Sequence, residues 1–168
     1  MTEEQRFLRE AIALARANIG NGGRPFGAVV VRNGEPIATG VNEILATNDP
    51  TAHAEMTAIR AASRKLASPD LSGCTVYASG QPCPMCMAAM RLAGVTRVVY
   101  AYSNEDGAPF GLSTAAIYED LAKPFADQSM TIRHVPVQLG DEAHLYAEWS
   151  DAQSKQRQVH GARKPGCK

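Results

Sequence analysis

The 168-residue chain has few cysteines, few aromatic residues and no net charge, and each shortage excludes a class of protein. Four cysteines are too few for a disulfide scaffold of this size. Seventeen acidic and seventeen basic residues cancel, so no overall positive field favours nucleic acid. With 45% hydrophobic and 20% charged residues, the composition is that of a globular protein rather than a disordered or coiled-coil chain.

Long apolar runs are also absent, because none approaches the ~18 residues that span a bilayer. The first six residues carry two acids, whereas a secretory signal begins with basic residues and a hydrophobic stretch. We therefore expect a cytoplasmic protein that makes no membrane contact.

The length predicts one domain, since domains usually contain roughly 100 to 200 residues. Residues 154–168 contain five basic residues and no acid, so residues 1–153 carry 17 acidic and 12 basic residues. We expect a single domain over 1–153, followed by a basic, flexible tail over 154–168. The acidic balance of the domain argues against a nucleic-acid partner.

Helices and strands alternate along the sequence. A capping-box spacing at Thr2 and Gln5 begins the first apolar periodicity, and glycines or prolines end most of the later segments. Strand–helix–strand repeats favour a mainly parallel sheet with helices on both faces. The predicted helices cover about 3–18, 52–66, 82–93, 115–121 and 141–156, and the predicted strands cover 28–32, 37–39, 75–79, 98–101 and 131–137.

Three candidate metal ligands lie at two predicted helix starts: His53 at one, Cys83 and Cys86 at the other. Two cysteines three residues apart in the first turn of a helix can point the same way, and the helix dipole stabilises their thiolates. One imidazole and two thiolates suit zinc and leave the fourth tetrahedral position to water, as a catalytic site requires. Zinc lowers the pKa of such a water toward 7.

Glu55 lies two residues after His53 and can reach the same site without being a ligand. It is therefore a candidate to carry protons between water and substrate. The pattern H-x-E followed by P-C-x-x-C is the signature of zinc nucleobase deaminases. From average residue usage, the probability that H-x-E and then P-C-x-x-C occur by chance in a random chain of this length is roughly a few in ten thousand.

Three other interpretations remain open. A structural zinc site needs a fourth ligand, for which Cys74 is a candidate, although a cysteine at the start of a strand is more typical of a small buried hydrophobe. A redox Cys-x-x-C pair would leave His53 and Glu55 without a role. A zinc-stabilised binding module without catalysis would use the ligands but not Glu55. We expect His134 and His144 to be ordinary structural or exposed histidines.

At these residues the chain resembles the cytidine-deaminase-like superfamily, and within it the small bacterial guanine deaminases; tRNA adenosine deaminases are similar over the same two zinc motifs. The resemblance implies an α/β fold, an αβα sandwich with a five-stranded mixed sheet in the order 2-1-3-4-5, strands 4 and 5 parallel, and a homodimer. The matching stretches are Pro25-Phe26-Gly27-Ala28-Val29, Asn42, Asn48 to Glu55, Pro82-Cys83-Pro84-Met85-Cys86 and Ile117-Tyr118.

The resemblance also implies roles. It makes His53, Cys83 and Cys86 the ligands of one zinc ion per subunit and Glu55 the proton shuttle. It places Asn42 as a hydrogen-bonding partner of the base and Phe26 in the pocket wall, although an aromatic residue at the start of a buried strand is equally typical of a core.

The chain departs from the guanine deaminases at Ser113 and Thr114, where they carry an acidic pair. The two hydroxyls accept hydrogen bonds more weakly than carboxylates and also donate, and we expect them to contact the substrate. Glu105 and Asp106 are the nearby acids that could supply a carboxylate to the base from another position. Gln81 also stands where the relatives usually have glutamate.

The sequence predicts hydrolytic deamination of a small aminated nucleobase or related heterocycle, with guanine, converted to xanthine, as the leading candidate. The alternatives are deamination of adenosine in tRNA, or of another heterocycle such as cytosine, a pterin, a triazine or a nucleoside.

Overall fold

The computed structural model describes residues 1–137, 140 and 143–161, with side chains through residue 157. It contains two compact units, Met1–Thr131 and Ile132–Lys168. The expected boundary between residues 153 and 154 falls inside the last helix, α7 (Leu145–Gly161). The division into a domain over 1–153 and a flexible tail over 154–168 stays a prediction. Within the described part of the chain, no helix is long and apolar enough to cross a membrane.

The first unit is built on a mixed sheet in the order β2-β1-β3-β4. The strands are β1 (Gly27–Arg32), β2 (Glu35–Val41), β3 (Cys74–Gly80) and β4 (Arg97–Tyr102). β1 is antiparallel to both β2 and β3, and only β3 and β4 form a parallel pair. The expectation of a mainly parallel sheet is therefore wrong, because the crossover from β2 to β3 joins strands that lie on either side of β1.

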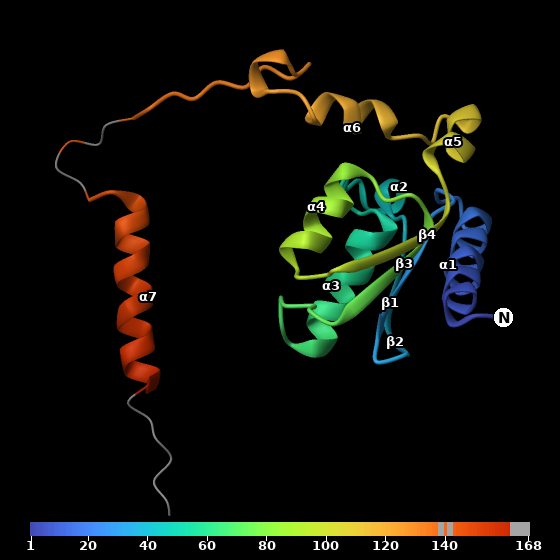
Figure 1. Cartoon of the computed structure of the whole chain (residues 1–168), viewed down its shortest axis with the longest axis horizontal. Coiled ribbons are helices and arrows are strands. Elements are labelled where there is room, and N and C mark those ends of the chain that lie inside the picture. Colours follow the sequence, from blue (N-terminus) through green and yellow to red (C-terminus); the bar gives the residue numbers. More distant parts are fainter. Residues whose placement is uncertain (138–139, 141–142, 162–168) are drawn as a thin grey trace, which may run out of the picture. The chain divides into compact units, whose positions relative to one another are not determined.

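Helices cover both faces of this sheet, as predicted: α1 (Glu3–Gly20) lies on one face, and α3 (Ala54–Leu66) and α4 (Pro84–Leu92) lie on the other (Figure 1). Side chains of a strand alternate between faces. Val29 and Val31 accordingly pack in a small cluster with Phe7 of α1, while Ala28 and Val30 belong to the larger core beneath α3 and α4.

The remaining helical segments are short, apart from α7. The capping box that starts α1 is present, with Thr2 and Gln5 each bonding to the backbone of the other. The helix predicted over 115–121 is α6 (Ala115–Leu121), and the predicted last helix begins later than expected, at Leu145. The other segments are α2 (Ile44–Thr47), α5 (Asn104–Gly107), η1 (Ala108–Phe110) and η2 (Phe125–Asp127).

The predicted fifth strand is not formed, so the described sheet has four strands rather than five and no strand parallel to β4 on its outer side. Residues 131–137 have no regular secondary structure and are exposed. Strand-forming residues adopt a strand only where a neighbouring strand can pair with them. Pro136 also removes one backbone donor that such pairing would need.

Candidate metal centre and active site

Two helix starts bring the predicted metal ligands together. His53 is the N-cap residue of α3 and Cys83 is the N-cap residue of α4; both have extended backbone, and Pro84 occupies the first helical turn of α4. Cys86 follows in that turn and is fully buried. The three residues form one group that can hold a metal ion.

The distances within this group fit zinc. The two Sγ atoms are 3.5 Å apart, and Nδ1 of His53 lies 3.5 Å from Cys83 Sγ and 3.7 Å from Cys86 Sγ. Zinc bonds of 2.3 Å to sulfur and 2.0 to 2.1 Å to nitrogen give a tetrahedron with edges of roughly 3.5 to 3.8 Å. The donor set therefore has the right elements at the right spacing.

The structure does not place Cys74 in this group. It begins β3, whereas the residues that lead to Cys83 follow the other end of the same strand. Burial raises the pKa of the Cys74 thiol, which is typical of a small core residue. Among the residues that the structure describes, the group that could hold a metal thus consists of three donor residues.

The two thiols of the group have opposite electrostatic character. A hydrogen bond with Cys86 lowers the pKa of Cys83 to about 4, and the same interaction raises the pKa of Cys86. The pKa of His53 is raised, chiefly by its hydrogen bond with Cys83, while the positive charge of Arg24 acts in the opposite direction. The cluster thus carries a thiolate at neutral pH, the form of cysteine that binds zinc.

Glu55 lies beside the metal group in the first turn of α3 and is only 6% exposed. Its Oε2 atom accepts a hydrogen bond from Cys86 Sγ at 3.5 Å. Burial raises the pKa of its carboxyl above the ordinary value. The carboxyl is therefore close to the ligands without belonging to their group.

A cavity of about 120 Å³ opens from this end of α3 and α4. It brings together seven of the eight residues singled out from the sequence, and Cys86 lies directly behind it. Its lining comprises Arg24, Phe26, Asn42, His53, Glu55, Gln81, Cys83, Gly111, Leu112, Ser113 and Thr114.

The two candidate substrate contacts from the first hairpin are held close together. The backbone N–H of Asn42 donates to the carbonyl of Phe26 at 3.2 Å. The side chain of Asn42 is buried, and its Oδ1 accepts a long hydrogen bond of 3.4 Å from the backbone of Ile44. Phe26 lies in the cavity wall and also packs against the larger core.

The hydroxyls of Ser113 and Thr114 line the cavity but already have partners. Thr114 donates from its backbone N and from Oγ1 to Oδ1 of Asn104, at 2.9 and 3.3 Å. Ser113 Oγ accepts from the N–H of Ala115 at 3.3 Å. Asn104, which is buried, donates its backbone N–H to Oε1 of Gln81 at 3.0 Å. A chain of polar groups thus fixes this wall.

The acids that were considered as replacements for the missing pair do not reach the cavity. Asp106 caps its own short helix by bonding to Ser103, and a hydrogen bond with Ser103 also lowers the pKa of Glu105. Neither residue belongs to the lining. Glu55 is therefore the only carboxylate among the described residues of the cavity wall.

Sequence reasoning missed several residues that shape the site. Arg24 at the rim and Asn104 behind the wall belong to no motif and were not singled out, while Gln81, noted only as a departure from the relatives, lines the cavity and accepts from the backbone of Asn104. Asn18 of α1 was also missed, although its amide bonds to the carbonyls of both Arg24 and Asn42. The sequence holds one indication that Asn18 lies close to this segment. Gly23 follows α1, and a side chain at that position would overlap Asn18.

Comparison with known proteins agrees with this geometry. Bacillus subtilis guanine deaminase is 39% identical over 150 residues, covering 89% of this chain and 95% of that protein. Its X-ray structure superimposes with a TM-score of 0.76 and 36% identity, covering 91% of this chain and 93% of the other. The tRNA-specific adenosine deaminase of Aquifex aeolicus is 31% identical over 81% of this chain and 87% of its own length.

A further solved structure is a complex with 2,6-diaminopurine. It is 33% identical with a TM-score of 0.64, and covers 67% of this chain and 63% of the other. The model of the cytidine and deoxycytidylate deaminase zinc-binding region matches residues 1–102, a range that contains His53, Glu55, Cys83 and Cys86. The chain therefore belongs to the family of cytidine and deoxycytidylate deaminases.

Proposed function

We propose that the protein is a zinc-dependent hydrolytic deaminase that releases ammonia from an aminated nucleobase or related heterocycle, with guanine, converted to xanthine, as the leading substrate. The observation that carries this proposal is the spacing of three metal-binding atoms beside a buried carboxyl at the end of a cavity. The similarity to Bacillus subtilis guanine deaminase supports the choice of substrate.

In this proposal Nδ1 of His53 and the Sγ atoms of Cys83 and Cys86 hold one zinc ion per subunit. When bound, zinc supplies Lewis-acid activation of water at neutral pH. Glu55 accepts one proton from the attacking water and delivers it to a ring nitrogen; it then takes the remaining proton from the hydroxyl added to the ring carbon and delivers it to the departing amine. Its burial beside Cys86 keeps the carboxyl within reach of the reacting atoms.

The rest of the cavity would hold the heterocycle. Phe26 provides a flat apolar wall, and the Asn42 amide offers a donor and an acceptor to the ring edge. Because Ser113 and Thr114 replace an acidic pair and their hydroxyls are engaged, the donor-rich edge of guanine meets no second carboxylate. Other aminated heterocycles such as cytosine, pterins, triazines or nucleosides are therefore expected to compete with guanine.

The similarity to tRNA-specific adenosine deaminases supports a second candidate, deamination of adenosine in tRNA. Measuring ammonia release from purines, pyrimidines, pterins, triazines, nucleosides and tRNA would separate the two. A homodimer and a cytoplasmic location also belong to the proposal, on the family resemblance; light scattering and cell fractionation test them.

The decisive experiment is Glu55→Gln. The amide keeps the volume of the side chain and leaves the three ligands in place, so fold and zinc content should remain. Turnover should fall by about 10² to 10⁴-fold, the usual contribution of a general acid–base group. Wild-type turnover in this variant, with ammonia as the measured product, would remove Glu55 from the mechanism and favour a different role for the zinc site.

A further inference from the structure

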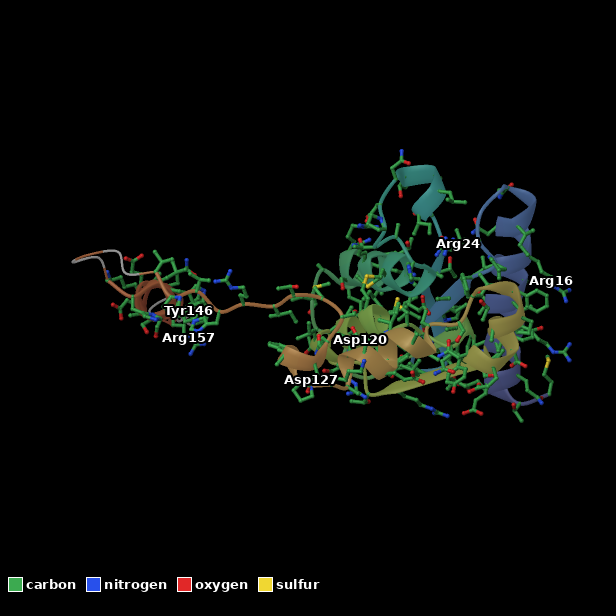
Figure 2. The ribbon with its side chains drawn as sticks, turned by 90° about the horizontal axis from the view of Figure 1, so that it is seen from above. Arg16, Arg24, Asp120, Asp127, Tyr146 and Arg157 are labelled. Carbon is green, nitrogen blue, oxygen red and sulfur yellow. The ribbon has the colours of Figure 1, made fainter. Side chains whose placement is uncertain are left out.

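Arg24, labelled in Figure 2, lies on the segment that joins α1 to β1 and lines the same cavity as Asn42, His53 and Glu55. Its side chain is exposed. The guanidinium is therefore at the rim, where it is accessible to solvent and to a ligand in the cavity.

The backbone of Arg24 is fixed, which distinguishes it from an ordinary surface arginine. Its carbonyl accepts hydrogen bonds from the Asn18 side-chain amide and from the backbone N–H of Phe26, both at 2.8 Å. The same amide of Asn18 donates to the carbonyl of Asn42 at 2.9 Å. Asn18 thus connects the rim to the residue expected to read the base, and Gly23 leaves the space for it.

The guanidinium of Arg24 has no partner among the residues that the structure describes. Among the residues that the structure describes, no carboxylate forms an ion pair with it, and its side chain makes no hydrogen bond. Guanidinium carries five N–H donors in a planar fork that matches the two oxygens of a carboxylate or phosphate. A fixed backbone therefore presents an unpaired fork at the mouth of a cavity that holds one carboxyl, Glu55, at its far end.

We propose that Arg24 is a specificity-determining residue that selects aminated heterocycles carrying a negatively charged substituent, a phosphate or a carboxylate, which lies at the rim while the ring occupies the cavity. This inference rests on the proposed function and narrows its substrate class. It also agrees with the absence of a second carboxylate in the cavity wall, since such a group would repel an anionic substrate.

The test measures binding rather than turnover. Zinc-loaded Glu55→Gln protein, in which hydrolysis is slow, is titrated by calorimetry with two matched pairs: guanosine and guanosine 5′-monophosphate, and pterin and pterin-6-carboxylate. The charged member of at least one pair should have a Kd at least about tenfold lower than its neutral partner, because charge-assisted hydrogen bonds with Arg24 add to its binding free energy. The phosphate pair and the carboxylate pair distinguish the two sources of charge.

Adding Arg24→Gln should abolish this preference and leave the affinity of the neutral compounds within about twofold, whereas Arg24→Lys should keep part of it. Arg64→Gln, on the exposed side of α3 and outside the cavity, is the matched control and should change neither affinity. Equal affinity for charged and neutral compounds, no measurable binding of the charged ones, or a preference that survives Arg24→Gln overturns the inference. Ammonia release by the wild-type enzyme tests the proposed function separately.

Discussion

Cys83 and Cys86 have one negative charge between them in the absence of metal, because the hydrogen bond that lowers the pKa of Cys83 raises that of Cys86. Binding a divalent cation requires Cys86 to lose its proton as well, and the imidazole of His53 would complete the set at matching distances. The two cysteines would supply charge, and all three residues would supply the geometry. Removing one should leave a site too poor in donors to retain zinc.

Cys83→Ala should therefore lose zinc. Alanine has no donor atom, and the remaining Cys86 and His53 give only two of the three ligands that hold the metal. Elemental analysis of the purified variant against the wild type measures the loss, with Cys74→Ala as a control that should keep full occupancy. Full zinc content in Cys83→Ala would contradict the ligand assignment.

Asn42→Ala should weaken substrate binding by about 1 to 3 kcal/mol, since a buried polar edge of the base loses its partner. Zinc content should not change, because Asn42 is not a ligand. The specificity constant with the best substrate measures the effect. Asn42→Asp keeps the acceptor for the backbone of Ile44 but cannot donate, so it separates recognition of the base from support of the turn. Unaltered kinetics in both variants would leave Asn42 a purely structural residue.

At the residue scale, the sequence was most informative where ligands and their spacing repeat a short pattern. Two local motifs contain His53, Glu55, Cys83 and Cys86, so these residues could be singled out from the sequence as candidates for the site. Residues such as Asn18 and Asn104 could not, because they act through partners 6 to 24 positions away. A polar residue within a helix or loop carries no local sign of such a partner.

At the scale of elements, the position of α3 against the sheet determines where His53 and Glu55 lie. Gly40 of β2 faces the first turn of α3, and a Cβ atom there would overlap the carbonyl of Ala54 and come within 2.5 Å of the nitrogen of Ala58. Both are backbone atoms and cannot rotate away. The close approach of strand and helix therefore depends on glycine at this position.

Gly40→Ala should destabilise the protein by about 1 to 3 kcal/mol, the usual cost of overpacking, and should lower its affinity for zinc by shifting the start of α3. Urea denaturation and competition with a chelator measure the two effects. Gly20→Ala is the matched control, because no atom lies within 4 Å of the added Cβ. Equal stability of Gly40→Ala and wild type would show that α3 can move without affecting the sheet.

Element positions could be predicted more reliably than their pairing. Apolar periodicity and capping residues located α1, α3, α4 and α6 to within a few residues. Pairing was less accessible from the pattern alone: the sheet is mixed, in the order β2-β1-β3-β4 that the family resemblance implied, rather than mainly parallel, and the segment 131–137 pairs with no described strand. Strand residues indicate a tendency to extend, whereas neighbours and direction depend on the rest of the fold.

For the molecule as a whole, the distribution of charge bears on the choice between a small heterocyclic substrate and tRNA. Residues 1–153 carry five more acidic than basic residues, and the basic excess is confined to 154–168. Neutralising phosphates requires lysines and arginines near the backbone of the nucleic acid. The acidic domain therefore favours a small substrate over tRNA.

Fluorescence anisotropy with labelled tRNA should give only weak binding, with Kd no tighter than about 10⁻⁵ M near physiological salt, within the range of nonspecific contacts. A variant with glutamine at the five basic positions of the tail should behave like wild type. Tight, salt-dependent binding that this variant loses would instead support the tRNA candidate. The five positions are Lys155, Arg157, Arg163, Lys164 and Lys168.

The three metal ligands lie close together in the chain as well as in space, since His53 and Cys86 are separated by only 33 positions. Closing a loop of this length costs about (3/2)RT ln n, roughly 3 kcal/mol, apart from a constant. All donor atoms have therefore been synthesised before β4, the wall with Ser113 and Thr114, or α7 exists. Metal can be captured by the growing chain once α3, β3 and the start of α4 assemble, so that the cavity wall with Ser113 and Thr114 is completed around a finished metal centre.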